Sequence, residues 1–410
     1  MPKTLKPGSG TAPWLTVVGI GEDGVAGLGD RAKQTLRNAE HVFGGERHLG
    51  LASALIRGHA QAWPKPFDGA LAAVRALRGK SVAVLASGDP FLWGVGATLA
   101  RHIPATEMLV LPAPSAFSLA AAKLGWALAE VNCVSLHGRP VSRLRPCLRP
   151  GRRVLALTSD GNGPAEVAAL LVRHGFGASR VTVLEALGGP RERVSSQTAD
   201  GDWSQAFDPL NLVAVEVAGG GFALPLTPGL PDETFRHDGQ ITKSAVRALT
   251  LSALAPRPGE LLWDVGAGSG SVAVEWMLGD PSLWAIAIEA RADRAENIRA
   301  NAEALGVPGL QVVEGRAPEA LRDLPAPDAV FVGGGGSGEG AMPAVMEALK
   351  PGGRLVANAV TLEMEAVLLD LQARHGGHLL RLALSAAEPV GGMTGWRPAM
   401  PVTQWAWVKP

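Results

Sequence analysis

A glycine-rich turn between an expected strand and an expected helix constrains the fold of this chain more than any other feature. Residues 264–270 read DVGAGSG, after an apolar lead-in over 260–263 and before a helical pattern over 271–278. A strand, a glycine turn and a helix in that order form a ligand-binding crevice at the carboxyl end of the strand. The turn therefore predicts an open α/β sheet with a nucleotide-type ligand at this point.

The spacing of the glycines indicates which ligand. In a dinucleotide fingerprint the third glycine follows the second by three residues, whereas here Gly270 follows Gly268 by two and Ser271 stands at the fingerprint position. With Asp264 opening it, the turn resembles the first motif of S-adenosylmethionine (SAM)-dependent methyltransferases. SAM carries no phosphate, so the loop needs only to let backbone approach its methionine part. A glycine turn that binds nothing is the alternative.

The bulk composition limits the class of protein. A chain of 410 residues with 47% hydrophobic and 19% charged residues is long enough for two or three α/β domains. Its formal net charge is zero and it has no basic run, so nucleic acid is not expected as a partner. Arginine is more frequent than lysine, which suits a ligand with several carboxylates, although a GC-rich gene would give the same bias.

The two cysteines, Cys133 and Cys147, have neither the spacing of a disulfide framework nor that of a metal site. This usage predicts a reducing cytoplasm and no bound metal. No apolar run reaches membrane-spanning length, so no membrane association is expected. Residues 1–13 lack the apolar core of a signal peptide, and we expect them to form a flexible tail.

A change of composition divides the chain. Residues 218–231 read AGGGFALPLTPGLP, a linker between a domain over 14–217 and one over 232–410. A break near Pro112 suggests two lobes in the first domain. That domain is expected to have strands at 15–20, 81–86, 108–111, 153–158, 180–185 and 212–217, and helices at 30–38, 67–77 and 115–124. The second is expected to have a helix at 243–254 and strands, in open parallel order, at 261–265, 284–289, 310–313, 329–332 and 353–358.

Further motifs in the second domain carry a resemblance to a known family. Residues 231–249 contain PDETF, DGQITK and VRAL, and GRAPEAL at 315–321, FVGGGG at 331–336 and NAVTLE at 358–363 follow in order. This series resembles the decarboxylating precorrin methyltransferases of cobalamin biosynthesis (CbiT-like enzymes). The resemblance implies a Rossmann-like class I SAM-dependent methyltransferase fold.

An acid at the end of the second strand, Glu289, lies 25 residues after Asp264 and is placed to accept hydrogen bonds from both ribose hydroxyls. A surface acid at a strand end is the alternative, and Asp264 is expected to orient the loop. Arg316 departs from the family pattern, which usually has an acid there for the adenine amino group, so backbone near Ala317 is expected to hold adenine. With the family resemblance, the expected SAM site comprises Thr242, Asp264, Gly266, Ala267, Gly268, Ser269, Gly270, Glu289 and Ala317.

The first domain contains a literal G-x-G-x-x-G at Gly19, Gly21 and Gly24, with Glu40 at a suitable distance for a dinucleotide ribose. Taken alone, this pattern suggests an NAD-dependent oxidoreductase. Residues 25–29 insert more loop before the next helix, however, and a lone pattern of this kind is weak evidence.

Downstream motifs carry a second resemblance. They read GGERHL at 44–49, SGDP at 87–90, PSAFS at 114–118, LHGR at 136–139 and LEALGGPRER at 184–193. Together they resemble the tetrapyrrole methylase family, in its CbiE-like branch, which implies a two-lobed fold with SAM bound between the lobes. The implied cofactor residues are Gly19, Gly21, Ser87, Gly88, Asp89, Ser115 and Ala116.

Four residues are candidates for chemistry. His137 is a candidate proton carrier, although a histidine at the end of a strand is more often structural. Asp89 stands in a Gly-Asp-Pro turn, where aspartate often bonds its own backbone. Asp232 and Lys243 lie in the segment expected to cap the second SAM site. Candidate clamps for substrate carboxylates are Arg47, Arg139, Arg247 and Arg397, the last from its glycine- and tryptophan-rich loop.

The two resemblances together imply one bifunctional enzyme of cobalamin biosynthesis. With two SAM molecules, one per domain, it would methylate carbons 5 and 15 of precorrin-6B and decarboxylate the carbon-12 acetate, giving precorrin-8. The first domain would act at carbon 5 and the second at carbon 15, in a homo-oligomer (dimer or tetramer). The alternatives are a methyltransferase of RNA or protein with a non-catalytic tetrapyrrole-binding domain, an oxidoreductase, and a corrinoid carrier.

Overall fold

The computed structural model describes residues 13–64 and 67–410, and the chain divides into two compact units. The first unit runs to Val141 and then from Arg149 to Phe222, while the second comprises Ser142–Leu148 and Ala223–Pro410. The change at Phe222 falls in the expected linker. Ser142–Leu148 belong to the second unit, although the division predicted from the sequence assigns them to the first domain. The expected tail, apart from Pro13, lies outside the described residues.

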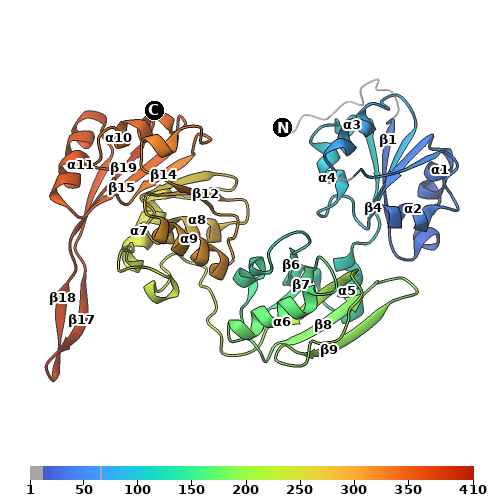
Figure 1. Ribbon diagram of the computed structural model, residues 1–410, viewed down its shortest axis with the longest axis horizontal. Helices are drawn as coiled ribbons and strands as arrows, with labels where there is room; N and C mark the ends of the chain where they lie inside the picture. The colour runs from blue at the N-terminus through green and yellow to red at the C-terminus, as the bar shows by residue number, and fades with distance from the viewer. Residues whose placement is uncertain (1–12, 65–66) are drawn as a thin grey trace, which may run out of the picture. The chain divides into compact units, whose positions relative to one another are not determined.

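The first unit begins with a five-stranded parallel sheet (Figure 1). Alternate residues of its first strand, β1 (Leu15–Ile20), point to opposite faces, so that Val18 packs with one pair of helices and Val17 with the other. In the order β3-β2-β4-β1-β5, the strands are β1 (Leu15–Ile20), β2 (His41–Gly44), β3 (His59–Ala62), β4 (Val82–Ser87) and β5 (Met108–Leu111). The helices α1 (Asp30–Asn38) and α2 (Glu46–Ala52) cover one face, and α3 (Ala70–Arg75) and α4 (Val95–Ala100) the other.

A second sheet follows the break near Pro112, as the two-lobed prediction requires. Its order is β6-β7-β10-β8-β9, with β6 parallel to β7 and the other pairs antiparallel. The elements are α5 (Ala116–Leu124), β6 (Val131–Ser135), β7 (Arg153–Leu157), α6 (Gly163–Arg173), β8 (Arg180–Glu185), β9 (Arg193–Thr198) and β10 (Asn211–Glu216). Helix α5 packs its apolar side on β7, β8 and β10.

The second unit is a three-layer α/β/α arrangement around a seven-stranded sheet of order β13-β12-β11-β14-β15-β19-β16 (Figure 1). Its strands are β11 (Leu261–Val265), β12 (Trp284–Glu289), β13 (Gln311–Glu314), β14 (Ala329–Val332), β15 (Arg354–Ala359), β16 (His378–Leu382) and β19 (Val402–Val408). The helices α7 (Ser244–Leu254), α8 (Ser271–Gly279) and α9 (Ala292–Leu305) cover one face, and α10 (Ala341–Ala348) and α11 (Leu362–His375) the other.

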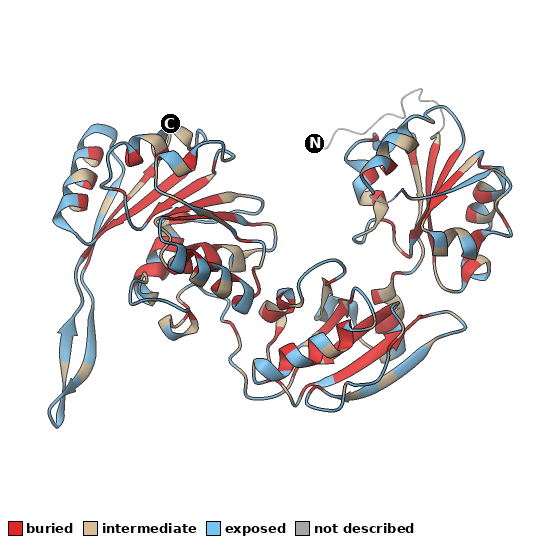
Figure 2. Ribbon diagram, in the orientation of Figure 1, coloured by how far each residue is buried: buried red, intermediate tan, exposed pale blue. Residues whose placement is uncertain are grey.

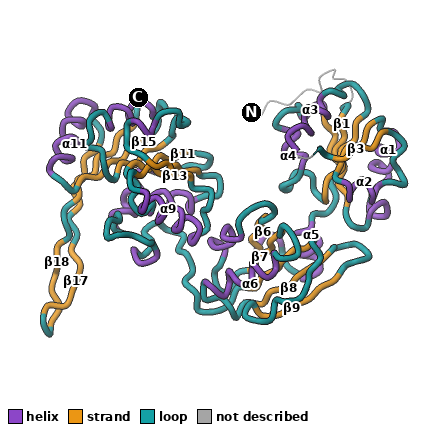
Figure 3. Tube along the Cα trace, viewed as in Figure 1, coloured by secondary structure: helices purple, strands orange, loops and turns teal. Residues whose placement is uncertain are grey.

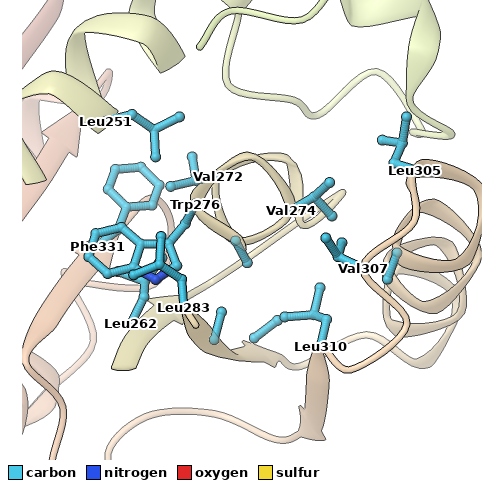
Figure 4. Close-up of a cluster of buried hydrophobic side chains, with 14 of the residues drawn as sticks. Leu251, Leu262, Val272, Val274, Trp276, Leu283, Leu305, Val307, Leu310 and Phe331 are labelled. Atoms are coloured by element: carbon cyan, nitrogen blue, oxygen red, sulfur yellow. The ribbon is translucent and has the colours of Figure 1, made fainter. Parts of the chain in front are cut away.

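The predicted parallel order is confirmed for the five predicted strands, β11 to β15. The sheet also contains two strands that were not predicted, and one of them, β19, runs antiparallel to both β15 and β16. Beneath α8, Val272 and Trp276 pack with Leu262 and Phe331 of the sheet (Figure 4). This packing holds the start of α8, and with it the glycine turn, against the ends of the strands.

A two-stranded ribbon, β17 (Ser385–Val390) with β18 (Met393–Pro398), stands apart from both layers of helices (Figure 3). It is exposed along most of its length (Figure 2), with Met393 80% and Trp396 77% exposed. Arg397 lies on β18 and pairs with Glu388 at 3.0 Å, so the expectation that it stands in a loop is wrong.

Short 3₁₀ segments complete the fold: η1 (Gly24–Gly27), η2 (Phe67–Gly69), η3 (Ala105–Glu107), η4 (Leu128–Glu130), η5 (Val141–Cys147), η6 (Asp232–Thr234) and η7 (Glu319–Leu321). The expected helix at 67–77 is thus split into η2 and the shorter α3. None of the helices within residues 13–64 and 67–410 has the length and apolarity to cross a bilayer.

Candidate functional site

A cavity of about 590 Å³ lies in the first unit, where the carboxyl ends of β1 and β4 meet the start of α5 and the ends of strands in the second sheet. Both sheets contribute to its lining. Among the residues that the sequence singled out, the cavity brings together Gly21, Arg47, Ser87, Gly88, Asp89, Ser115, Ala116, His137 and Arg139.

Close backbone approach shapes one wall of this cavity. The Gly88 amide donates to the Ile20 carbonyl at 3.1 Å, and the Ala113 amide donates to the Gly88 carbonyl at 3.1 Å. A Cβ on Gly19 would lie 1.9 Å from the Gly88 oxygen, so only glycine fits there. Gly19 is not one of the lining residues. It shapes the cavity indirectly, because it allows the Gly88 backbone to approach β1 closely. Ser115 caps α5 by accepting a hydrogen bond from the Ser118 amide at 3.1 Å.

A polar array crosses the same cavity. Arg47 of α2 pairs with Glu22 and donates from Nη2 to His48 Nε2 at 2.8 Å and to Ser87 Oγ at 2.9 Å. Ser87 Oγ also lies 2.8 Å from His48 Nε2. Burial, with the Arg47 charge beside it, lowers the pKa of His48 to about 4, so that the imidazole is neutral near pH 7.

The other polar lining residues are arranged more simply. Asp89 Oδ1 accepts a hydrogen bond from the Phe91 amide at 2.8 Å, which is the backbone-bonding role of an aspartate in a turn. His137 and Arg139 are exposed in the turn after β6, where the Arg139 amide donates to the Leu136 carbonyl at 2.9 Å. Arg139 therefore presents a solvated guanidinium to the cavity.

The G-x-G-x-x-G of the first unit does not have dinucleotide geometry. Gly24 begins η1 instead of a long helix, and its amide closes a turn on the Gly21 carbonyl at 3.0 Å. Helix α1 begins only at Asp30. No helix N-terminus thus stands directly at this glycine turn to receive a pyrophosphate.

In the second unit, the glycine turn lies between the ends of β12 and β14, which flank β11 in the sheet. Gly266, Gly268 and Gly270 have φ of +70°, +59° and +72°. A Cβ on Gly266 would lie 2.2 Å from the Gly334 oxygen of the loop after β14. Both the backbone conformation and the close approach therefore require glycine at this position.

Two acids support the turn. Asp264 is buried, accepts from the Ala273 amide at 3.1 Å through Oδ2, and has no partner at Oδ1. Burial raises its pKa to about 7, and the nearby Glu289 carboxylate adds to the rise. Glu289 accepts from the amides of Gly268 at 2.8 Å and Arg291 at 3.0 Å. Each of its oxygens keeps a lone pair for a further donor.

A buried ion pair between Arg247 and Glu275 of α8 stabilises the segment that precedes the glycine turn. The Arg247 side chain is 0% exposed, and its Nε donates to Glu275 Oε1 at 2.6 Å. Its other nitrogens donate to the carbonyls of Thr242 and Leu230 and, at 3.3 Å, to Asp232. Arg247 has no surface with which to reach a substrate carboxylate, so the expected clamp is not available at this residue.

Asp232 and Lys243 are brought together at the surface, with 3.4 Å between Oδ2 and Nζ. Ala317 is half-buried and the neighbouring Arg316 is exposed. Sequence reasoning did not single out His48 for chemistry or Glu275 for support. The GGERHL motif contained a signal for His48, whereas the partner of Glu275 lies 28 residues away and no local pattern connects the two.

Comparisons with known proteins identify the family of each part of the chain. Residues 15–200 match the tetrapyrrole (corrin/porphyrin) methylase family, and residues 233–409 match the precorrin methyltransferase domain family. The chain is 61% identical to precorrin-6Y C(5,15)-methyltransferase (decarboxylating) of a Sinorhizobium species, over 97% of either chain. It is 43% identical to the enzyme of the same name from Mycobacterium tuberculosis, over 96% of this chain and 100% of that one. A solved C-terminal domain of precorrin-6Y C5,15-methyltransferase from Rhodobacter capsulatus is 55% identical, covering 45% of this chain and 100% of its own, with a TM-score of 0.44.

The fold and these matches define a methyltransferase built from a tetrapyrrole methylase part and a precorrin methyltransferase part. Sequence identity over nearly the full length of the relatives defines the family more closely. The chain belongs to the family of decarboxylating precorrin-6Y C(5,15)-methyltransferases of cobalamin biosynthesis. This membership supports the bifunctional interpretation and not the RNA or protein methyltransferase.

Proposed function

We propose that the chain methylates carbons 5 and 15 of precorrin-6B and decarboxylates the carbon-12 acetate, with a separate SAM site in each unit. The observation that carries the proposal is the presence of two glycine-lined strand ends, one beside the cavity of the first unit and one at the 266–270 turn of the second. We assign the first activity to residues 14–217 and the second to 232–410, with 218–231 as linker. The family acts on a small tetrapyrrole in a biosynthetic pathway, and we place the enzyme in the cytoplasm.

The residues present fit SAM in the second unit. SAM supplies a methyl group activated on a sulfonium. Glu289 would accept the two ribose hydroxyls with the lone pairs that its backbone contacts leave free. Asp264 holds the start of α8, the positive-φ glycines leave room for the methionine part, and backbone near Ala317 would hold adenine. Thr242, whose carbonyl accepts a hydrogen bond from Arg247, would complete the site.

In the first unit, Gly88, Asp89, Ser115 and Ala116 would hold SAM at the cavity wall. Arg139 is the better candidate for a substrate carboxylate, because Arg47 is already paired with Glu22. The bridging carbons of a reduced tetrapyrrole are enamine-like nucleophiles, so placement of substrate beside the methyl donor supplies most of the rate. Decarboxylation in the second unit uses the conjugated macrocycle as electron sink. Asp232 and Lys243 remain our candidates for the proton that replaces carbon dioxide.

Single-site variants test the assignment of units. Gly88→Val adds a β-branched side chain at φ +51°, where even a Cβ would lie 2.8 Å from the Pro114 oxygen. We expect its product to carry one new methyl, at carbon 15, and to have lost carbon dioxide. Gly266→Ala should give a single methyl at carbon 5 and keep the acetate. Mass spectrometry with NMR of the product distinguishes these outcomes. A single variant that stops both methylations would contradict two separate sites.

We also propose that the chain is a homo-oligomer assembled through the β17–β18 ribbon. An isolated two-stranded ribbon is marginally stable in water, and this one exposes Val390, Met393 and Trp396. The double variant Met393→Glu, Trp396→Glu should therefore give the mass of a single chain in light scattering after gel filtration. Trp284→Glu, at an apolar side chain 61% exposed on β12, is the matched control and should leave the assembly intact. An unchanged mass in the double variant would contradict assembly through the ribbon.

A further inference from the structure

Methylation of a bridging carbon creates a need for a proton acceptor. The carbon forms its new bond to the methyl group with π electrons of the macrocycle and then carries both a hydrogen and a methyl. Conjugation returns only when the carbon–hydrogen bond breaks and its electron pair re-enters the ring. The proton must go to a group held beside that carbon.

The polar array in the first unit contains such a group. Arginine can only donate, so His48 Nε2, 2.8 Å from Arg47 Nη2, is unprotonated and accepts. The imidazole proton is then on Nδ1, which is buried without a hydrogen-bond partner. Ser87 Oγ receives a hydrogen bond from Arg47 at 2.9 Å and can direct its own proton to His48 Nε2 at 2.8 Å.

The place of Ser87 suits this task. It ends β4, is exposed to the cavity, and precedes Gly88 of the expected SAM loop. In a reactive complex the methyl group and the attacking carbon are about 3–3.5 Å apart. A hydroxyl beside the methyl donor is therefore also beside the carbon that loses its hydrogen.

We propose that Ser87 and His48 are the proton-accepting pair of the first unit. The carbon–hydrogen bond breaks and the proton passes to Ser87 Oγ. The Arg47 hydrogen bond to His48 Nε2 breaks, and the hydroxyl proton of Ser87 passes to the lone pair of that nitrogen, giving imidazolium. Arg47 Nη2 already donates a hydrogen bond to Ser87 Oγ, and this bond stabilises the serine oxygen as the hydroxyl proton leaves it. The proton then passes to water, and Glu22 keeps Arg47 in place throughout. The inference rests on the proposed methylation at carbon 5.

Burial and the Arg47 charge support the direction of this transfer. They lower the pKa of His48 to about 4, which keeps the ring neutral before the reaction and makes the imidazolium release its proton afterwards.

The test compares Ser87→Ala and His48→Gln with the wild-type full chain, using precorrin-6B that carries either hydrogen or deuterium at carbon 5. We expect carbon-5 methylation to slow by about 100-fold or more in both variants, far more than any change in SAM affinity or KM accounts for. Proton loss should then limit the rate, so a primary deuterium isotope effect should appear in the variants and be small in the wild type. His59→Gln, on the exposed strand β3, is the control and should leave the carbon-5 rate unchanged.

The outcomes separate this inference from the proposed function. The proton-accepting pair is overturned if Ser87→Ala methylates carbon 5 at the wild-type rate. It is also overturned if the rate falls only in proportion to SAM affinity and shows no isotope effect. Neither result contradicts the proposed function. Methylation of carbon 15 by a wild-type chain that adds no methyl at carbon 5 contradicts the proposed function of the first unit, and the pair with it.

Discussion

Replacing Glu275 with alanine is expected to lower the free energy of unfolding of the second unit by about 3–5 kcal/mol. The substitution leaves the Arg247 guanidinium, 0% exposed, without its close and buried carboxylate and with only the longer contact to Asp232 at 3.3 Å. It also removes the acceptor of the Gly229 amide at 2.6 Å and the Leu230 amide at 2.9 Å. Urea denaturation followed by the fluorescence of buried Trp263 and Trp276 measures the effect.

The matched control is Glu314→Ala. Glu314 pairs with Arg299 at 2.8 Å, but both side chains are about half exposed, at 47% and 51%. A surface pair of this kind contributes about 0–1 kcal/mol. Because Arg247 also holds Thr242 and Asp232, Glu275→Ala should weaken SAM binding in the second unit as well. Equal stability losses in the two variants would show that the buried pair does not fasten the segment before the glycine turn.

Replacing Gly266 with alanine is expected to abolish SAM binding in the second unit and to reduce the binding stoichiometry of the chain from two to one. The new Cβ would meet the Gly334 oxygen at 2.2 Å, against backbone that cannot rotate away, and the residue would be strained at φ +70°. Isothermal titration calorimetry with SAM measures the number of sites directly.

Gly259→Ala separates steric closure of the site from backbone strain. Gly259 has a φ of +83°, similar to that of Gly266, but a Cβ there meets nothing within 4 Å. It should therefore destabilise the turn modestly and leave both SAM sites intact. Full binding at two sites in Gly266→Ala would contradict the placement of SAM at residues 266–270.

The parts of the fold that the sequence predicted are those with a strong local signal. Helix α1 and strands β1, β5, β8, β11, β12 and β14 have the predicted bounds, and β4, β10, β13 and β15 are shifted by one residue. The missed β3 reads HAQA, is exposed throughout and has no apolar alternation. The unpredicted β19 is fixed by antiparallel pairing with β15 and β16, and β15 lies many residues earlier in the chain, which a local pattern cannot reveal.

In the candidate site, too, the residues with a local sequence signal could be predicted and the others could not. Asp264 and Glu289 could be placed because the glycine spacing and the strand ends define where they stand. The array around Ser87 could not, since Glu22 lies 25 residues before Arg47 and Ser87 lies 40 after it. Arg47 and Arg247 are alike as residue types. Only their burial distinguishes a guanidinium at a cavity from one held inside the unit.

The most direct test of two methylations and one decarboxylation on a single chain is the product formed from precorrin-6B and SAM with a deuterated methyl group. High-resolution mass spectrometry of the wild-type product should show two labelled methyls gained and one carbon dioxide lost. NMR should place the labels at carbons 5 and 15. Two results would contradict two methylations and a decarboxylation on one chain. One is a macrocycle that stays unchanged although SAM is bound, and the other is a product with a single labelled methyl that retains the acetate.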